Sequence, residues 1–296
     1  MKFPIRLIRN NTDIKFLSYR KVCFIISSLL IAISISFLFL KGLNYGIDFK
    51  GGTLIEIQKI TGDADVGHIR ELIKNIDIGD VQIQEFGNST DVLIRVEQQM
   101  GGDSAQQNVI KLVKGVIGSQ YEFRRVEVVG PKVSSELIYS GILAVLLAIV
   151  AVVLYIWFRF EWQFSIGAML ALMHDIIITI GLFSILQLEF NLSIIAAILT
   201  IVGYSLNDTV VVYDRIREEL RKYKSMNFLD LLNLAVNATL SRTTITSVTT
   251  ILALLSLYIF GGEVIRGFTF AMIWGVIIGT YSSIFIAAPV LLYLNI

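Results

Sequence analysis

Six apolar segments alternate with polar segments along the 296 residues of the chain. Most of them approach the ~20 residues that an α-helix needs to cross the hydrocarbon core of a bilayer. The pattern therefore predicts a polytopic α-helical membrane protein, with six transmembrane helices at residues 22–41, 138–158, 163–188, 192–213, 244–260 and 268–294.

The longest polar segment, residues 42–137, separates the first two apolar segments and contains ten Lys or Arg and fourteen Asp or Glu residues. Apolar and polar positions alternate, as they do in strands, over residues 53–60, 81–86, 91–96 and 121–129. Apolar residues recur at helical spacing over residues 65–76 and 104–117, and residues 87–90 are typical of a hairpin turn. The order strand, helix, strand, strand, helix, strand predicts a small α+β domain of the ferredoxin-like kind, βαββαβ.

The glycine pair Gly51-Gly52 precedes the first of these strands. A phosphate-binding loop would need one of two longer glycine patterns, GxGxxG or GxxxxGK followed by Ser or Thr, and neither occurs in the sequence. The pair therefore predicts a turn that leads into the strand. The missing loop also argues against a nucleotide-hydrolysing motor.

Basic residues flank the apolar segments unevenly. Residues 1–21 contain one acidic residue and a set of basic ones, namely Lys2, Arg6, Arg9, Lys15, Arg20 and Lys21. Residues 214–243 are also rich in basic residues and include an amphipathic stretch that can lie along the membrane surface. The positive-inside rule places both segments and both termini in the cytoplasm, with residues 42–137 in the periplasm. The first apolar segment is too long for a signal peptide and lacks a cleavage site, so we expect an uncleaved helix.

The end of the chain departs from this charge pattern. Leu294-Asn295-Ile296 carries no basic flank after the sixth apolar segment, which leaves open whether the native chain extends past Ile296.

The composition narrows the possible functions. With 55% hydrophobic residues and a formal net charge of +1, the chain has no basic surplus for binding nucleic acid. Two His residues and the single Cys23 cannot form a structural zinc site or a disulfide. They also cannot assemble a nucleophile, a base and an orienting group, so we expect no enzyme activity, no metal and no cofactor.

The fourth apolar segment contains the polar run Gly203-Tyr-Ser-Leu-Asn-Asp-Thr209. At helical spacing Tyr204 lies over Asp208 and Gly203 over Asn207, so small and polar groups share one stripe. A carboxylate at the centre of a membrane helix costs about 2.5–3.5 kcal/mol on insertion scales. Loss of that charge on protonation is the property that a proton carrier needs, so Asp208 is the first functional candidate. Alternatively, Asp208 lies hydrated at the inner headgroups or only hydrogen-bonds a neighbouring helix.

The fifth apolar segment begins with Arg242 and a row of hydroxyl residues on one helix face, namely Thr243, Thr246, Ser247 and Thr250. One hypothesis is that this row forms a wetted stripe facing Asp208. The alternative is that the hydroxyls bond back to their own helix and that Arg242 only reaches lipid phosphates. The sixth segment carries a small-residue face that permits close helix packing and needs no chemical role, namely Gly275, Gly279, Ser282, Ser283 and Ala287.

With these features in place, the chain resembles the SecD/SecF family of bacterial accessory protein-export subunits, within the RND superfamily, and specifically its SecF half. The residues that carry the resemblance are Gly46-Ile-Asp-Phe-Lys-Gly-Gly-Thr53, Val129-Gly-Pro131, Phe158-Arg-Phe-Glu-Trp162, His174-Asp175, Gly203-Tyr-Ser-Leu-Asn-Asp208, Asp214-Arg-Ile-Arg-Glu218, Arg242-Thr243 and Gly261-Gly262.

The resemblance implies a multi-pass protein of the bacterial inner membrane that uses the proton-motive force, with protons as the coupling ion, to assist protein export. Its implied partners are SecD, the SecYEG channel, YajC, translocating preproteins and membrane lipid. The implied proton path uses Asp208 and Arg242. Asp48, Gly51, Gly52, His174 and Asp175 also match the family pattern, with roles left open.

Two other functions remain open from the sequence. One is half of a proton-coupled RND-type exporter for lipids or small molecules, and the other is a non-conducting scaffold for the translocon.

Overall fold

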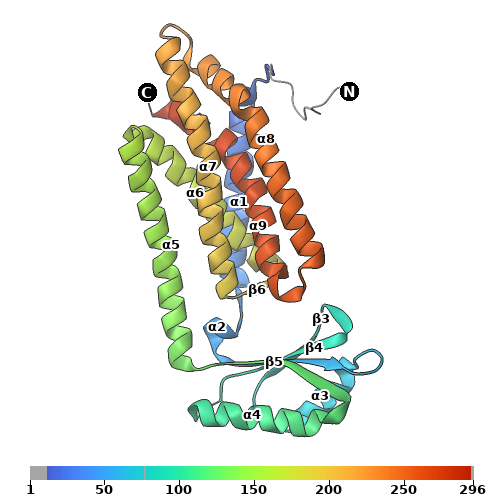
Figure 1. The fold of residues 1–296 in the computed structure, drawn as a ribbon. Coiled ribbons are helices and arrows are strands. Elements are labelled where there is room, and N and C mark those ends of the chain that lie inside the picture. Colours follow the sequence, from blue (N-terminus) through green and yellow to red (C-terminus); the bar gives the residue numbers. More distant parts are fainter. Residues whose placement is uncertain (1–11, 77, 100, 295–296) are drawn as a thin grey trace, which may run out of the picture.

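The computed structural model describes residues 12–76, 78–99 and 101–294. Long helices form a bundle, and an α+β unit lies at one end of it (Figure 1). The described residues do not include the end of the chain at Ile296. They also leave out three of the basic residues on which the cytoplasmic placement of the amino terminus is based, namely Lys2, Arg6 and Arg9.

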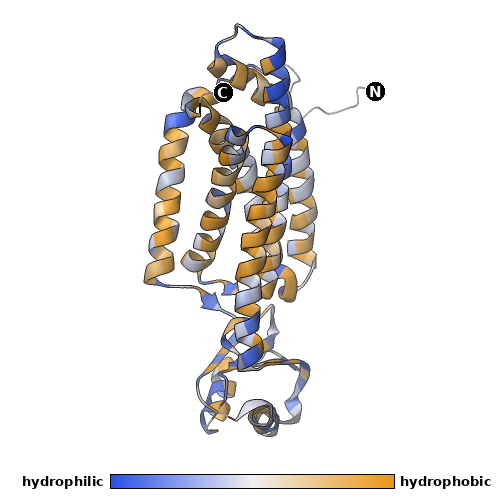
Figure 2. Ribbon diagram, turned by 90° about the vertical axis from the view of Figure 1, so that its left-hand side faces the viewer, coloured by the Kyte–Doolittle hydropathy of each residue, from blue (hydrophilic) through white to orange (hydrophobic). Residues whose placement is uncertain are grey.

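Six helices in the described chain are long and apolar enough to cross a membrane, which confirms the predicted polytopic helical protein. They are α1 (Arg20–Leu40), α5 (Pro131–Arg159), α6 (Trp162–Leu186), α7 (Leu192–Lys222), α8 (Phe228–Phe260) and α9 (Glu263–Ser282). The last span continues through the π-helical segment η3 (Ser283–Ala287), α10 (Ala288–Val290) and η4 (Leu291–Tyr293). Apolar residues dominate the middle of the bundle, and polar residues gather at its ends (Figure 2).

The central helices of the bundle are α6, α7 and α9. Buried residues make up 67% of the apolar window of α9 and 56% of that of α6, against 6% for α5 and 11% for α8. The outer helices therefore present their apolar faces to lipid or to another protein, while the central three have to satisfy the polar groups that they carry.

Residues 214–243 do not form the separate amphipathic segment that we expected before the fifth span. Helix α7 runs on to Lys222, and α8 is continuous from Phe228 to Phe260. No Gly or Pro interrupts the sequence of α8, and its first turns bury Leu231 and Leu232 in the core of the bundle. Periodicity identified the apolar face correctly but could not show that it continues into the span.

The second span also starts earlier than expected. Helix α5 begins at Pro131 rather than residue 138, because a proline at the first helical position needs no hydrogen-bond partner for its missing N–H.

The α+β unit follows the predicted order of strands and helices. Its elements are β2 (Gly52–Lys59), α3 (Val66–Lys74), β3 (Val81–Phe86), β4 (Asn88–Val96), α4 (Gly102–Ile117) and β5 (Tyr121–Val129). The strands form one antiparallel sheet in the order β3-β4-β2-β5. Ile55 and Val92 of the sheet pack with Ile69 of α3 and Val113 of α4. The hairpin turn is tighter than expected, since β4 already starts at Asn88.

Three short elements at the junction of the two parts were not predicted. They are β1 (Asn44–Tyr45), α2 (Ile47–Lys50) and β6 (Glu189–Phe190), and β1 pairs with β6 in parallel. Elements of two to four residues leave no periodic pattern in a sequence.

The prediction of a turn at Gly51-Gly52 is confirmed. Both residues have positive φ, 74° and 120°, a region that side chains disfavour. A Cβ atom on Gly52 would also overlap the carbonyl oxygen of Val96. The glycine pair lets β2 approach the end of β4 and enter the sheet.

Small residues bring α9 close to α7. A Cβ atom on Gly275 would overlap the side chain of Ile201, and one on Gly279 would lie 3.0 Å from Cβ of Ser205. Because Ser205 and Asp208 share α7, this contact decides which α9 side chains can reach them.

We expect Gly52→Ala to destabilise the α+β unit by about 3 kcal/mol, because backbone strain and overlap with Val96 add. Gly62→Ala is the matched control, since Gly62 also has positive φ but has no neighbour within 4 Å. It should cost only about 1 kcal/mol. Amide hydrogen exchange of β2 and β4 measures the destabilisation caused by each substitution. Equal exchange rates in the two variants would contradict the close approach of Gly52 to Val96.

A second substitution tests the contact between α7 and α9. We expect Gly275→Ala to lower the free energy of unfolding by about 1–3 kcal/mol, because the added methyl group overpacks the contact with Ile201. Gly267→Ala is the control on the same helix. A Cβ atom at Gly267 would lie 3.6 Å from the side chain of Ile194, an ordinary contact, so this substitution should leave the free energy of unfolding nearly unchanged. Denaturant unfolding in detergent micelles compares them, and equal stability would argue against the close crossing.

Candidate functional site

Asp208 is buried where three helical elements meet. Thr243 of α8 donates a hydrogen bond to its Oδ1 at 2.8 Å, and Ser283 of η3 lies 3.3 Å from its Oδ2. The side chain therefore points into the bundle, with 7% of its surface exposed. The alternative of a carboxylate hydrated at the headgroups does not fit this burial, although the bond to a neighbouring helix is present.

Arg242 lies next to this site but forms no ion pair with Asp208 in the described part of the chain. Its side chain is exposed and lines an open pocket of about 600 Å³ together with Asn237 and Ile245. Thr243 follows Arg242 by one residue, and consecutive helix residues point about 100° apart. The threonine therefore takes the direct contact, while the guanidinium attracts the carboxylate only at longer range.

The predicted hydroxyl row does not act as one stripe. Thr243 faces Asp208, whereas Ser247 hydrogen-bonds Thr280 of α9 at 2.7 Å. Thr246 bonds back to the carbonyl oxygen of Arg242 at 2.9 Å, and Thr250 is half-buried. Thr243 therefore fits the hypothesis of a hydroxyl that faces Asp208, and Thr246 fits the alternative of a hydroxyl that bonds back to its own helix.

The other polar residues of α7 divide between two faces. Asn207 and Gly203 are exposed on the surface of the bundle, away from Asp208. Tyr204 is half-buried, and its hydroxyl has no hydrogen-bond partner among the described residues. An exposed amide on a membrane helix needs a partner outside this chain, such as another protein.

A second carboxylate lies on the neighbouring helix α6. Asp175 is fully buried and accepts hydrogen bonds from Ser205 at 2.6 Å and Ser282 at 2.8 Å. His174 Nδ1 lies 2.9 Å from the other oxygen of Asp175. The structure brings these two residues together with α7 and α9, whereas the sequence analysis left their roles open. Ser282 and Ser283 were assigned only to helix packing.

The inner end of α7 is held by aromatic rings and ion pairs. Tyr213 is fully buried against Phe164 and Phe160, with ring centroids 5.0 Å and 6.1 Å away. Arg159 pairs with Asp214 at 3.0 Å on the surface. Two of the short motifs, Phe158 to Trp162 and Asp214 to Glu218, therefore meet here and anchor α7.

The outer end of α7 is tied to the α+β unit. Asp48 of α2 accepts a hydrogen bond from the backbone N–H of Leu192 at 2.8 Å, so it caps the first turn of α7. Arg95 of β4 forms an ion pair with Glu189 of β6. Burial raises the pKa of Glu189 above its ordinary value, and the Arg95 guanidinium opposes that shift. Residue pairs this far apart in the chain give no local sequence signal.

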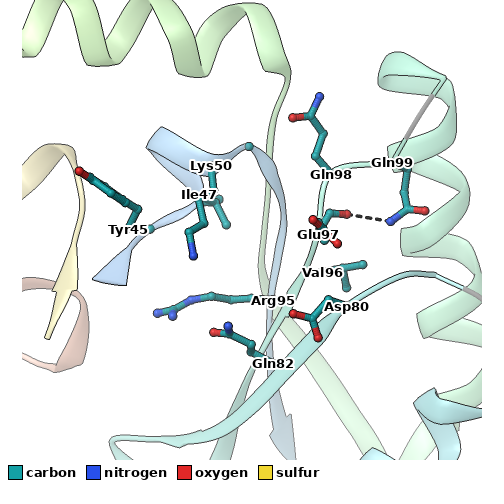
Figure 3. Close-up of a pocket in the computed structure, with 12 residues that line it drawn as sticks. Tyr45, Ile47, Lys50, Asp80, Gln82, Arg95, Val96, Glu97, Gln98 and Gln99 are labelled. Atoms are coloured by element: carbon teal, nitrogen blue, oxygen red, sulfur yellow. Dashed lines mark hydrogen bonds between the residues drawn. The ribbon is translucent and has the colours of Figure 1, made fainter. Parts of the chain in front are cut away.

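A pocket of about 430 Å³ opens beside this junction. Tyr45 and Lys50 line it from the α2 side, while Arg95 and Asp80 reach it from the sheet (Figure 3). The lining carries both signs of charge, and it includes Arg95, whose ion pair with Glu189 joins the two parts of the molecule.

Comparison with known protein families gives two matches to this chain. Residues 108–296 match the family described as "Protein export membrane protein SecD/SecF, C-terminal", and residues 36–58 match the "SecD/SecF GG Motif". The second match covers Asp48, Gly51 and Gly52.

Curated relatives match over almost the whole chain. The protein translocase subunit SecF of Rickettsia conorii is 45% identical over 98% of this chain and 94% of its own length. The subunit SecF of Rhodobacter capsulatus is 43% identical over 100% of this chain and 93% of its own. The protein translocase subunit SecDF of Brucella abortus is 44% identical over 98% of this chain, which spans only 38% of that longer protein.

Solved structures agree with these matches. The crystal structure of SecDF from Thermus thermophilus superposes with a TM-score of 0.85 at 33% identity, over 99% of this chain and 40% of that chain. A structure of SecDF in a super-membrane-facing form gives a TM-score of 0.71 at 32% identity, over 100% of this chain and 40% of that one. The chain belongs to the SecD/SecF family of protein-export membrane proteins.

Proposed function

We propose that the chain is a SecF-type subunit of the protein translocase that couples proton movement through Asp208 to assistance of protein export. The observation that carries the proposal is the carboxylate of Asp208, buried between α7, α8 and η3 with hydroxyl donors on both oxygens. A structural anchor in a membrane helix has no need of an ionisable group, and such groups mark ion pathways.

The energy that one proton releases on crossing the membrane is large enough to change how helices pack. Each charge that crosses the membrane potential releases about 2.3 kcal/mol per 100 mV. That energy can bias an equilibrium between two packed states but cannot unfold a domain. The relative SecDF is known in a super-membrane-facing form, and this chain fits that form less closely than it fits the other SecDF structure.

Helix α7 supplies the mechanical link. Asp208 follows Leu192 by sixteen residues, or roughly 24 Å along the helix axis. A change in the packing of Asp208 therefore tilts a rod whose outer end is held by Asp48 and lies beside the Arg95–Glu189 pair. The ferredoxin-like α+β unit would move with it on the periplasmic side and hold or release a translocating chain.

The exposed polar face of α7 and α8 supports a partner subunit in the membrane. Asn207, Gly203 and Arg242 are exposed on the described surface at the level of Asp208. In the longer relative from Brucella abortus, SecD and SecF are parts of one protein. A SecD-type subunit would cover this face and complete the site, and contacts with SecYEG and YajC would follow from that assembly in the inner membrane, with both termini cytoplasmic.

We expect Asp208→Asn to lower proton flux and export stimulation at least tenfold, because the amide keeps the size and hydrogen bonding of the side chain but cannot titrate. Asp230→Asn is the control, since Asp230 is an exposed carboxylate in the first turn of α8. Vesicles reconstituted with the partner subunit and a pH-sensitive dye measure flux. Full flux in Asp208→Asn would leave only the scaffold function.

Arg242 provides a separate test of the same pathway. We expect Arg242→Gln to lower proton flux at least tenfold, because the long-range attraction on Asp208 is lost. Arg242→Lys keeps the charge and should retain more flux than the glutamine variant, since no bidentate pair is present to break. The same vesicles compare the two variants, and undiminished flux in Arg242→Gln would assign the arginine to lipid phosphates alone.

A further inference from the structure

Asp175 has the burial and the partners of a group that ionises inside the bundle. None of its surface is exposed, and its three hydrogen-bonding neighbours are His174, Ser205 and Ser282. Ser205 comes from α7, the helix that carries Asp208, and Ser282 is the last residue of α9, directly before Ser283, which faces Asp208. Burial disfavours the charged form of a carboxylate, whereas hydrogen bonds donated to its oxygens favour that form.

His174 is a buried base with one unused nitrogen. Only 3% of its surface is exposed, and its Nε2 has no hydrogen-bond partner among the described residues. Its ring stacks on Tyr281 of α9, with the centroids 5.9 Å apart. When Nδ1–H donates to Asp175, Nε2 holds a free lone pair that can accept a proton. A histidine that only anchored helices would use both nitrogens, because leaving a buried polar group unpaired is unfavourable.

Ser282 can serve both charge states of Asp175. Its Oγ lies 2.8 Å from Asp175 Oδ2 and 3.1 Å from the carbonyl oxygen of Gly279. One hydroxyl hydrogen can satisfy only one of these acceptors at a time. When Asp175 is ionised, the hydrogen points at the carboxylate. When Asp175 is protonated, its O–H donates to the serine oxygen and the serine hydrogen turns to Gly279.

Ser283 has the same choice beside Asp208. Its Oγ lies 3.3 Å from Asp208 Oδ2 and 3.0 Å from the carbonyl oxygen of Thr280. Two consecutive serines therefore face the two carboxylates, one each. Ser205 precedes Asp208 by three residues, so Asp175 lies about 4.5 Å nearer the outer end of the bundle along α7.

We propose that Asp175 and His174 form a second proton-binding site, which protons from the outer face occupy before they reach Asp208. The inference rests on the function proposed above. The proton binds to a carboxylate oxygen or to Nε2 and leaves as a proton, so no other bond is made or broken. Of the titratable residues on the helices around this site, Tyr281 of α9 stacks on His174 and hydrogen-bonds the backbone of Cys23 on α1. Tyr204 and Asp208 of α7 lie within one turn of Ser205, and the charged residues of α1 and α9 lie in the first turns of those helices. The charged residues of α5 lie at its ends, and η3 has no titratable residue.

The test combines infrared spectroscopy with proton flux in the full chain, reconstituted with its partner subunit. Asp175→Asn should remove a protonated-carboxyl stretching band from the difference spectrum between acidic and alkaline pH, while Asp208→Asn should retain that band. Asp175→Asn should also lower proton flux at least tenfold. The exposed Asp230→Asn should change neither quantity.

Ser282→Ala covers the case in which Asp175→Asn fails to fold. It keeps both carboxylates and removes one donor to Asp175, so the pH of half-maximal flux should shift while the maximal flux stays measurable. A purely structural role would leave the pH profile in place. An unchanged carboxyl band in Asp175→Asn, or an unchanged pH profile in Ser282→Ala, would overturn the proposal. Absence of proton flux in the wild-type complex would instead contradict the proposed proton-driven function. The infrared band would still test whether Asp175 binds a proton.

Discussion

The packing of α7 against α9 depends on two carboxylates that have to be hydrogen-bonded inside an apolar bundle. An ionised carboxylate without donors would cost far more than helix packing returns. Asp208 and Asp175 both accept hydrogen bonds from hydroxyl groups on helices other than their own, so the helices have to approach closely. Gly275 and Gly279 permit that approach, because any side chain at Gly275 would collide with Ile201. The small-residue face and the polar site are therefore one feature.

The two ends of α7 are held by interactions of different strength. At the inner end, Tyr213 is fully buried among aromatic rings, and moving it would expose a large apolar surface. At the outer end, Asp48 caps the helix with one hydrogen bond, and Arg95 and Glu189 are partly exposed. Caps and partly exposed ion pairs contribute about 1 kcal/mol each. A tilt of α7 would therefore pivot at its inner end and be largest where the α+β unit is attached.

Local patterns predicted the spans and the order of strands and helices along the chain, because each of these follows from periodicity within a single element. They left open whether Asp208 is buried or hydrated at the headgroups. Contacts between distant segments left no such signal. The Arg95–Glu189 pair joins residues 94 positions apart, and neither residue is unusual in its own segment. Ser282 and Ser283 looked like packing residues, since a hydroxyl in an apolar helix usually bonds its own backbone. Their second acceptors, on α6 and α7, exist only in the folded bundle.

The π-helical segment η3 gives the site an irregular backbone. It starts at Ser283, the residue that faces Asp208, and ends shortly before Pro289. Proline has no N–H to donate to the carbonyl of Phe285, so the regular bonding pattern of the helix cannot continue through this turn. Short π-helical turns are rare and are frequently found at functional sites. A hydroxyl that turns from carboxylate to carbonyl at Ser283 changes the bonding of Thr280, one turn earlier. In the proposed function, proton binding at Asp208 would therefore act directly on the least regular turn of the span, where a small change in charge can alter helix geometry.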